Sequence, residues 1–224
     1  MSVYAMIVAP SFKPFDPNKP VKIYRRILPH WRQDGATYFI TFHTSDSLPK
    51  AALAELKLRH DLWLQAHPLP HTKEEQKEIN RRLTVHTESW LDRGKGRCPF
   101  ARLKERMLLH GALTFFHGKR VVLIAFVIMP NHVHAIVRPL KGFELEAWIG
   151  SVKQYVSTRV DKAGQENRPF WFEEAYDRIV RDETHLKRCF RYIEHNPRKS
   201  GVPHAAGVRW LNPDWKPLGW KFSK

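Results

Sequence analysis

The sequence predicts an α+β domain built on a central antiparallel sheet of ferredoxin-like character, with helices packed on it. Three observations support this prediction. An apolar run over 121–129 is broken by Pro130-Asn131 and resumes over 132–137, which is typical of two buried strands in an antiparallel hairpin. Segments on either side carry apolar residues every three or four positions, as amphipathic helices do. The resulting order is strand, helix, strand, strand, helix and a terminal helix.

The first part of the chain supplies one strand and a helical insertion. Residues 1–35 are Pro-rich and basic, and we interpret them as an N-terminal arm that docks late on the domain. Residues 37–44 are rich in β-forming side chains and predict the first strand. Helical spacing predicts a helix over 51–65. Residues 67–100 are interpreted as a helical insertion, in which 72–90 forms a charged helix on the surface.

The second part of the chain supplies the strand pair, three more helices and a tail. Residues 101–110 resume helical spacing before the strand pair, and residues 143–162 carry a further apolar stripe after it. The terminal helix is predicted over 182–196, ending before Pro197. Residues 203–224 form a basic C-terminal tail that is rich in Trp and Lys.

The chain is strongly basic, with 38 Lys and Arg against 22 Asp and Glu and a formal net charge of +16. The positively charged side chains of such a protein repel one another unless a polyanion is the usual partner. Nucleic acid is the first candidate and an anionic membrane surface the second. No apolar run has the ~18 residues that span a bilayer, so we expect no membrane partner. Cys98 and Cys189 make no disulfide framework, so we expect a cytoplasmic, nucleoid-associated protein.

Two histidines bracket one apolar residue in the second strand of the predicted hairpin. Residues i and i+2 of a strand point to the same face, so His132 and His134 present their imidazoles side by side while Val133 points away. That arrangement suits two ligands of one divalent metal ion. An isolated pair of histidines on a strand is structural more often than catalytic. Other residues of the chain therefore have to supply the remaining groups of a catalytic site.

The terminal helix supplies a phenol and an amide. Tyr192 and Asn196 lie one turn apart on a flank of its apolar stripe, at the border between core and solvent. A phenol is a poor nucleophile at neutral pH, but a divalent ion such as Mg²⁺ or Mn²⁺, held by two imidazoles and an amide oxygen, can activate a phosphodiester for its attack. His195 is a rival third ligand. Tyr155 and Tyr176 are weaker candidates for the nucleophile, because neither has an oxygen ligand one turn later.

These motifs resemble those of a known family. Met129-Pro130-Asn131-His132-Val133-His134 resembles the His-hydrophobic-His signature of single-tyrosine (HUH) transposases, and Tyr192-Ile193-Glu194-His195-Asn196-Pro197 resembles the tyrosine motif of their REP-associated branch. In that branch the tyrosine attacks the DNA and the asparagine one turn later binds the metal, which implies these roles for Tyr192 and Asn196. The likeness implies a transposase-like catalytic domain over 36–202 that acts on single-stranded DNA, often on hairpins.

Basic side chains outside these motifs are candidate contacts to DNA phosphates. Lys153, in the helix after the histidines, is a candidate contact to the scissile phosphate, with a solvated lysine as the alternative. Asp177 is expected to form a salt bridge with Arg178 or Arg181 rather than to shape the site. The other candidates lie in the arm, in the glycine loop 92–97 and before the strand pair, and are Arg25, Arg26, Lys95, Arg97, Lys119 and Arg120.

The aromatic residues of the tail allow two interpretations. Trp210, Trp215 and Trp220 lie among lysines, and aromatic rings among cations can stack on unpaired bases. We expect them instead to pack over the surface of the domain.

The sequence as a whole predicts a metal-dependent endonuclease and strand transferase for single-stranded or hairpin DNA, with a 5′-phosphotyrosine intermediate. The REP-associated branch resembles self-contained monomers, so a monomer is favoured over a dimer. One alternative is a domesticated, non-catalytic nucleic-acid-binding protein, which explains the charge but not the histidine and tyrosine motifs. Another is a metal-dependent hydrolase that activates water with Glu174 or Asp177 as the base.

Overall fold

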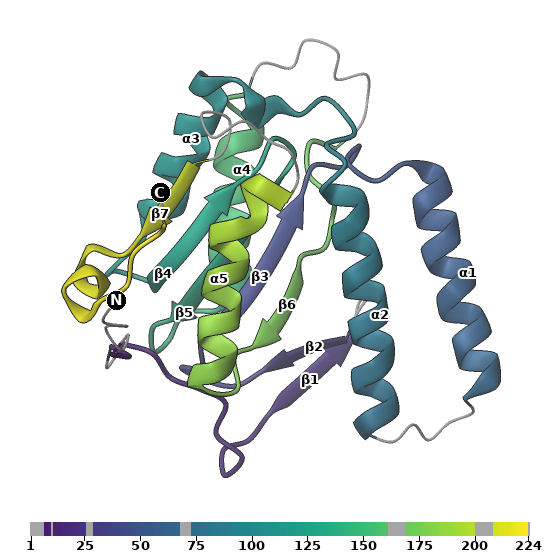
Figure 1. The fold of residues 1–224 in the computed structure, drawn as a ribbon, viewed down its shortest axis with the longest axis horizontal. Helices are drawn as coiled ribbons and strands as arrows, with labels where there is room; N and C mark the ends of the chain where they lie inside the picture. Colours follow the sequence, from purple (N-terminus) through teal and green to yellow (C-terminus); the bar gives the residue numbers. More distant parts are fainter. Residues whose placement is uncertain are drawn as a thin grey trace.

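A five-stranded antiparallel sheet forms the centre of the computed structural model, which describes residues 7–9, 11–25, 29–67, 73–160, 169–199 and 208–223. The order of the strands is β6-β3-β5-β4-β7. Without the edge strand β7, this is the order of a ferredoxin-like sheet, so the predicted α+β class is confirmed (Figure 1). The strands are β3 (Tyr38–His43), β4 (Val121–Ile128), β5 (His132–Pro139), β6 (Tyr176–Ile179) and β7 (Val208–Leu211).

The hairpin of β4 and β5 is the most buried part of the sheet, because both of its faces are covered. Every residue of β4 except Val122 is buried, which explains the continuous apolar run of the sequence. The register of the pair shifts between Leu123 and Ala125, so that Ile124 is accommodated as a bulge. The sequence predicts neither β6 nor β7, because each has only four residues and little alternation.

Two helices cover one face of the sheet (Figure 1). They are α3 (Leu103–Thr114) and α4 (Leu145–Ser157). Leu109 of α3 and Trp148 of α4 are buried in one core cluster with side chains of the sheet such as Phe42. The helix predicted over 143–162 is therefore present but ends earlier, at Ser157.

The terminal helix α5 (Glu183–Lys199) lies on the opposite face of the sheet (Figure 1). Leu186, Phe190 and Ile193 form the predicted apolar stripe and are buried in a second core cluster. The helix continues past Pro197, so the expected end before that residue is wrong. Proline fixes φ near the helical value but cannot donate to the carbonyl of Ile193, and α5 ends two residues later, at Lys199.

The tail belongs to the second core cluster. Trp215 and Trp220 are completely buried, and their ring centroids lie 4.9 Å apart. Both follow β7, which adds to the free edge of β4, and Trp215 lies in the short helix η3 (Pro213–Leu218). Trp210 stacks on Phe126 at 5.3 Å. Stacking on bases is therefore wrong for Trp215 and Trp220, because their rings are inside the protein.

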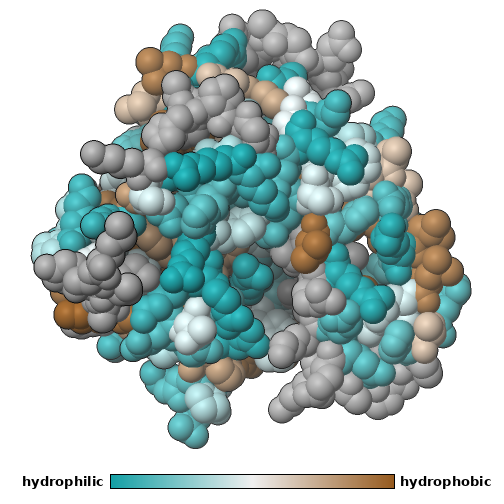
Figure 2. All heavy atoms as spheres, viewed as in Figure 1, coloured by the Kyte–Doolittle hydropathy of each residue, from teal (hydrophilic) through white to brown (hydrophobic). Residues whose placement is uncertain are grey.

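The helix predicted over 51–65 and the predicted helical insertion together form a hairpin of two helices beside the β6 edge of the sheet (Figure 1). Its helices are α1 (Lys50–Ala66) and α2 (Lys73–Leu91), followed by the short η1 (Pro99–Ala101). The last turns of α2 reach the sheet, where the Thr87 hydroxyl donates to the Tyr176 hydroxyl at 3.4 Å. Apolar side chains of α1, among them Leu58 and Leu62, remain exposed (Figure 2). No helix of the described residues is long and apolar enough to cross a membrane.

The N-terminal region is more than an arm, because it contains a two-stranded sheet that the sequence does not predict. Its strands are β1 (Lys22–Arg25) and β2 (Pro29–Arg32). Arg32 anchors this hairpin to the domain through Asp177 of β6 and Glu146 of α4, each at 2.6 Å. The expected pairing of Asp177 with Arg178 or Arg181 is wrong, because β6 points the carboxylate at the N-terminal hairpin.

Candidate active site

Strand β5 begins with the two predicted metal ligands. The rings of His132 and His134 lie on one face of the sheet with their centroids 4.7 Å apart, and both side chains are buried. The Nδ1 of His132 donates to the Oδ1 of Asn131 at 2.7 Å. The Nδ1 of His134 forms a hydrogen bond of 2.7 Å with the Oγ1 of Thr41 on the neighbouring strand. Both rings are therefore oriented through their Nδ1 atoms, as in proteins that bind metals through Nε2.

The Nε2 atoms of both histidines are buried and have no hydrogen-bond partner among the described residues. Burial lowers the pKa of His132 to about 3, and the neighbouring His43 adds to the shift. Burial also lowers the pKa of His134 well below its usual range. Both imidazoles are therefore neutral, as a metal ligand requires. Two adjacent, neutral and unpaired nitrogen atoms fit a divalent metal ion.

The sequence leaves Asn196 and His195 as rival candidates for the third ligand. In the described part of the chain, no group of three or more of these residues could hold a metal ion. Asn196 of α5 is 1% exposed, whereas the side chain of His195 is 57% exposed and its Nδ1 lies 2.7 Å from the carbonyl oxygen of Arg191. Burial therefore favours the Asn196 amide over the His195 imidazole as a ligand to an ion on the sheet.

Helix α5 brings Tyr192 onto the histidines. The Tyr192 ring packs edge-on against the ring of His134 at 5.0 Å and against Phe39 at 5.8 Å. Two motifs that are far apart in the sequence thus meet within one chain. Burial raises the pKa of the Tyr192 phenol above its ordinary value, and the negative charges of Glu88 and Asp92 add to the shift. The phenol is therefore neutral at pH 7 in this arrangement.

The last turns of α2 supply acidic groups that the sequence analysis missed. The carboxyl of Glu88 interacts with the hydroxyl of Tyr192, and burial raises the pKa of Glu88. The Oδ2 of Asp92 lies 2.6 Å from the Nζ of Lys199, which itself lies 5.6 Å from the centre of the Tyr192 ring. The spacing of α2 predicts a solvated, charged helix. Only its packing beside α5 shows that one of its faces belongs to the site.

Comparison with known proteins identifies the segment that carries the two histidines and Tyr192. Residues 105–196 match the family model described as IS200-like transposase. We call residues 105–196 the transposase segment. It contains His132, His134, Tyr192 and Asn196, whereas the insertion with Glu88 lies outside it.

The comparisons with whole proteins are more distant. No curated protein matches the chain. Among solved structures, the chain is similar to a REP-associated tyrosine transposase bound to a REP hairpin. The identity is 15%, the match covers 80% of this chain and 74% of that chain, and the TM-score is 0.45.

A third histidine, His43, lies next to His132 and His134 but comes from outside the transposase segment. His43 of β3 is directly opposite His132 in the register of β3 and β5, and it is buried. Its Nδ1 lies 2.9 Å from the carbonyl oxygen of Thr44 and 2.7 Å from the Oγ of Ser47. Burial lowers the pKa of His43 to about 4, so it forms a neutral wall of the site. The strand pairing that places it there has no local signal in the sequence.

The glycine loop lies directly beside the histidine motif of the transposase segment. The Nδ2 of Asn131 donates to the backbone oxygen of Lys95 at 2.9 Å. Gly96 has a φ of +90°, and a Cβ there would lie 2.7 Å from the carbonyl oxygen of Asp46, so this turn requires glycine. Lys95 is exposed, whereas Arg97 pairs with Asp46 at 2.8 Å. Of the predicted phosphate contacts, Lys95 and Arg97 are the two that lie near the histidines.

The other predicted phosphate contacts lie elsewhere. Lys119 and Arg120 precede β4, at the end of the β4–β5 hairpin opposite to His132. Arg26 and the side chain of Arg25 lie outside the described residues.

Lys153 is held by backbone oxygens. Its Nζ donates to the carbonyl oxygens of Phe172 at 2.7 Å and of Glu173 at 3.2 Å. The ammonium therefore ties α4 to the segment before β6 and is not a purely solvated charge, and its contact to the scissile phosphate stays a prediction.

The two carboxylates proposed as bases for water lie on the wrong side of the sheet. Asp177 is opposite Ile40 in the register of β3 and β6, and Ile40 is buried in the core cluster that α3 and α4 cover. Asp177 accepts from His30 at 2.6 Å, and Glu174 lies 3.6 Å from the same ring. Both groups therefore serve the N-terminal hairpin, on the opposite face from His132.

Proposed function

We propose that this chain is a metal-dependent endonuclease and strand transferase for single-stranded DNA, with Tyr192 as its nucleophile. The observation that supports the proposal most directly is the 5.0 Å contact between the rings of Tyr192 and His134 within the transposase segment. Nucleophile and imidazoles come from one chain, which also favours a monomer.

The tyrosine would attack the phosphorus of a phosphodiester. The bond between the Tyr192 oxygen and phosphorus forms as the bond from phosphorus to the 3′ oxygen breaks. The phenol loses its proton and the leaving oxygen gains one, which gives a 5′-phosphotyrosine and a free 3′ hydroxyl. Attack by a 3′ hydroxyl on the phosphotyrosine joins strands by the reverse reaction. Mg²⁺ or Mn²⁺ held by His132, His134 and Asn196 would supply Lewis-acid stabilisation of the negative charge.

We infer that the substrate is hairpin DNA of the REP-associated type. The net charge of +16 supports a polyanionic partner, and the exposed Lys95 lies beside the histidines. The tyrosine motif over 192–197 supports the REP-associated branch. The protein would act on the DNA of the nucleoid in the cytoplasm.

A cleavage assay on a labelled single-stranded hairpin with Mn²⁺ tests this proposal. Tyr192→Phe should lower cleavage by roughly 10³-fold or more and abolish the covalent protein–DNA adduct. Tyr155→Phe is the matched control, because Tyr155 is 43% exposed on α4 and should cut like the unmodified protein. Equal cutting by Tyr192→Phe, or a product with a 5′ phosphate and no adduct, would overturn the mechanism.

A non-catalytic DNA-binding protein is the second candidate function. It is favoured by the neutral Tyr192 phenol, whose hydroxyl faces the carboxyl of Glu88 in this arrangement. Binding of hairpin DNA that needs no metal, without cleavage under any divalent ion, would support this alternative. The water-activating hydrolase is not favoured, because Asp177 is paired with Arg32 and His30.

A further inference from the structure

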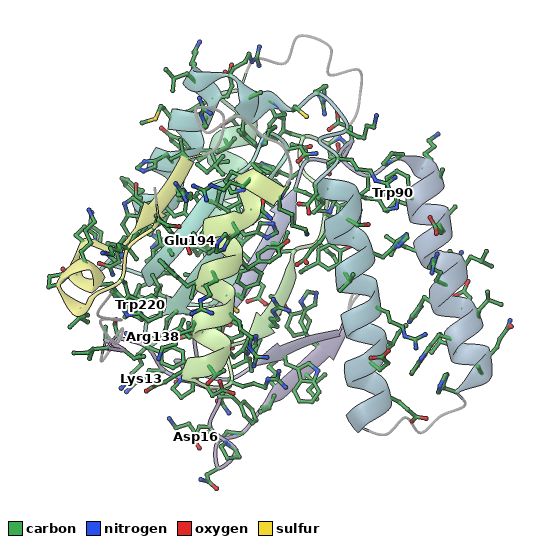
Figure 3. All side chains as sticks on the ribbon, viewed as in Figure 1. Lys13, Asp16, Trp90, Arg138, Glu194 and Trp220 are labelled. Atoms are coloured by element: carbon green, nitrogen blue, oxygen red, sulfur yellow. The ribbon has the colours of Figure 1, made fainter. Side chains whose placement is uncertain are left out.

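A cavity lined by basic residues lies at the end of the sheet opposite to the histidines. It has a volume of about 260 Å³ and is formed by residues 13–19, by residues 33–36 and by the region from the end of β5 to Lys141. Figure 3 labels Lys13 and Arg138, which lie close together there. Its cationic side chains are Lys13, Lys19, Arg138 and Lys141, and Asp34 is the carboxylate among its lining residues. Positive charge therefore exceeds negative charge in this cavity.

Arg138 is the most buried of these cationic side chains, since the three lysines are exposed. Its Nε donates to the backbone oxygen of Ser11 at 2.7 Å, whereas its two terminal nitrogens have no acceptor among the described residues. Burial lowers the pKa of Arg138, and no carboxylate offsets this effect. Removing a guanidinium from water without pairing it to an anion costs free energy. An anion that enters the cavity would recover part of that cost.

The walls of the cavity are held in place by hydrogen bonds. The backbone nitrogen of Asp16 donates to the Oε1 of Gln33 at 2.7 Å, and the Nε2 of Gln33 donates back to the carbonyl oxygen of Asp16 at 2.7 Å. The backbone nitrogen of Thr37 donates to the carbonyl oxygen of Lys13 at 2.8 Å. Gly35 has a φ of +68°, which allows the turn between these walls. A ligand would therefore find a site that needs little ordering.

The position of the cavity separates it from the candidate active site. Arg138 and His132 lie on the same strand, six residues apart, which corresponds to roughly 20 Å at ~3.3 Å per residue. Consecutive phosphates of one DNA strand are ~3.4 Å apart along a helix, so a phosphate about six nucleotides from the scissile bond spans this distance.

We propose that this cavity binds a backbone phosphate of the DNA, remote from the bond that is cut. The proposal rests on the proposed function, and it adds a second contact that holds the stem of a hairpin. A guanidinium with two free terminal nitrogens suits the paired oxygens of a phosphate, and the lysines add charge. Lys119 and Arg120 lie at the same end of the β4–β5 hairpin and extend the basic surface. That continuity favours a polyanion over a single free phosphate ion.

The test compares the full chain with Arg138→Gln/Lys141→Gln and with a control that removes the same charge. The control is Lys57→Gln/Lys104→Gln, whose lysines are exposed on α1 and α3. Binding is measured to a hairpin with a stem longer than six base pairs, over a range of salt. The cavity variant should reduce the slope of log K against log[salt] by about 1, as expected for the loss of one phosphate contact, with no comparable change for the control. Equal slopes for both variants would overturn the proposal.

Two further measurements separate the possible failures. Cleavage of a short single-stranded oligonucleotide, which does not reach the cavity, should be the same for the cavity variant and the unmodified protein. If no protein cuts but the slopes differ as expected, the cavity proposal stands and the proposed function fails.

Inorganic phosphate is then titrated while thermal stability is followed. Phosphate that stabilises only the unmodified protein, with unchanged slopes for DNA, would assign the cavity to a free phosphate and overturn the DNA contact. Lys141→Gln alone keeps the test valid if the double variant does not fold.

Discussion

At the scale of single residues, the site depends on which atom of each side chain is already engaged. His132 and His134 use Nδ1 for hydrogen bonds with Asn131 and Thr41, which leaves both Nε2 atoms buried and without a hydrogen-bond partner among the described residues. Asn196 and His195 are neighbours in the sequence and carry the two rival groups for the third ligand. Helix α5 turns Asn196 inward and His195 outward. Burial therefore distinguishes the two candidate ligands more clearly than the chemistry of their side chains does.

Variants of these two neighbours test the third ligand. Asn196→Ala should weaken binding of Mn²⁺, measured by calorimetry, by about 10-fold or more, because the ion would lose an oxygen ligand from the protein. His195→Ala is the matched control and should bind Mn²⁺ unchanged, since its side chain is 57% exposed. The reverse pattern would assign the third ligand to His195 instead.

At the scale of elements, α5 connects the site to the tail. Phe190 of α5 packs edge-on against Trp220 at 4.9 Å and stacks on Phe222 at 5.0 Å. The same helix carries Tyr192, so the position of the nucleophile depends on aromatic side chains that come last in the chain. The tail is therefore part of the support of the site.

Removal of the Phe190 ring tests this support. Phe190→Ala should lower the free energy of unfolding by about 3–5 kcal/mol, because it leaves a cavity in the second core cluster. Urea unfolding followed by circular dichroism measures the change. Phe115→Ala is the control, since Phe115 is 64% exposed and should cost about 1 kcal/mol or less. Similar losses for both variants would contradict the packing described here.

A second element-scale prediction concerns the N-terminal hairpin. Asp177 is buried and binds both Arg32 and His30, so Asp177→Asn leaves a buried guanidinium with less compensation. The variant should lose about 3 kcal/mol of unfolding free energy, measured in urea. Glu55→Gln removes an exposed partner of Arg59 and should leave the free energy of unfolding nearly unchanged. A loss for Asp177→Asn no larger than that of Glu55→Gln would show that the buried network does not hold the hairpin.

At the scale of the whole molecule, buried histidines set the response to acid. Burial lowers the pKa of His43 and of His185 to about 4, against about 6.5 in the unfolded chain. Between these values the unfolded chain binds protons that the folded chain does not. The share of the stability that depends on these two histidines should therefore be constant above about pH 6.5 and should fall toward pH 4, by up to about 1.4 kcal/mol per pH unit for each histidine.

Unfolding in urea at a series of pH values measures this dependence. His30 acts in a different pH range, because the hydrogen bond with Asp177 raises its pKa: its contribution to stability is complete below about pH 6.5 and is lost as the pH rises through the raised pKa. His185→Gln should reduce the loss of stability between about pH 6.5 and 4. A stability that does not change across this range would contradict the burial of neutral imidazoles.

Local patterns determine a large part of this protein. The side-chain period of a strand places His132 and His134 on one face in any fold that makes this segment a strand. The helical period likewise places Tyr192 and Asn196 on one flank of α5, and continuous apolarity marks β4 as buried. These properties depend on neighbours within a few positions, so the sequence alone is sufficient to predict them.

Contacts between distant segments were decided only by the tertiary structure. The strand order places His43 beside His132, and the docking of α2 places Glu88 against Tyr192. The fold also places three backbone carbonyl oxygens near the ammonium of Lys153, contacts that no local pattern in the sequence predicts. The basic cavity around Arg138 likewise combines segments from the start and the middle of the chain. The physical reason is that periodicity decides which way a side chain points along its own element, whereas packing decides what it meets.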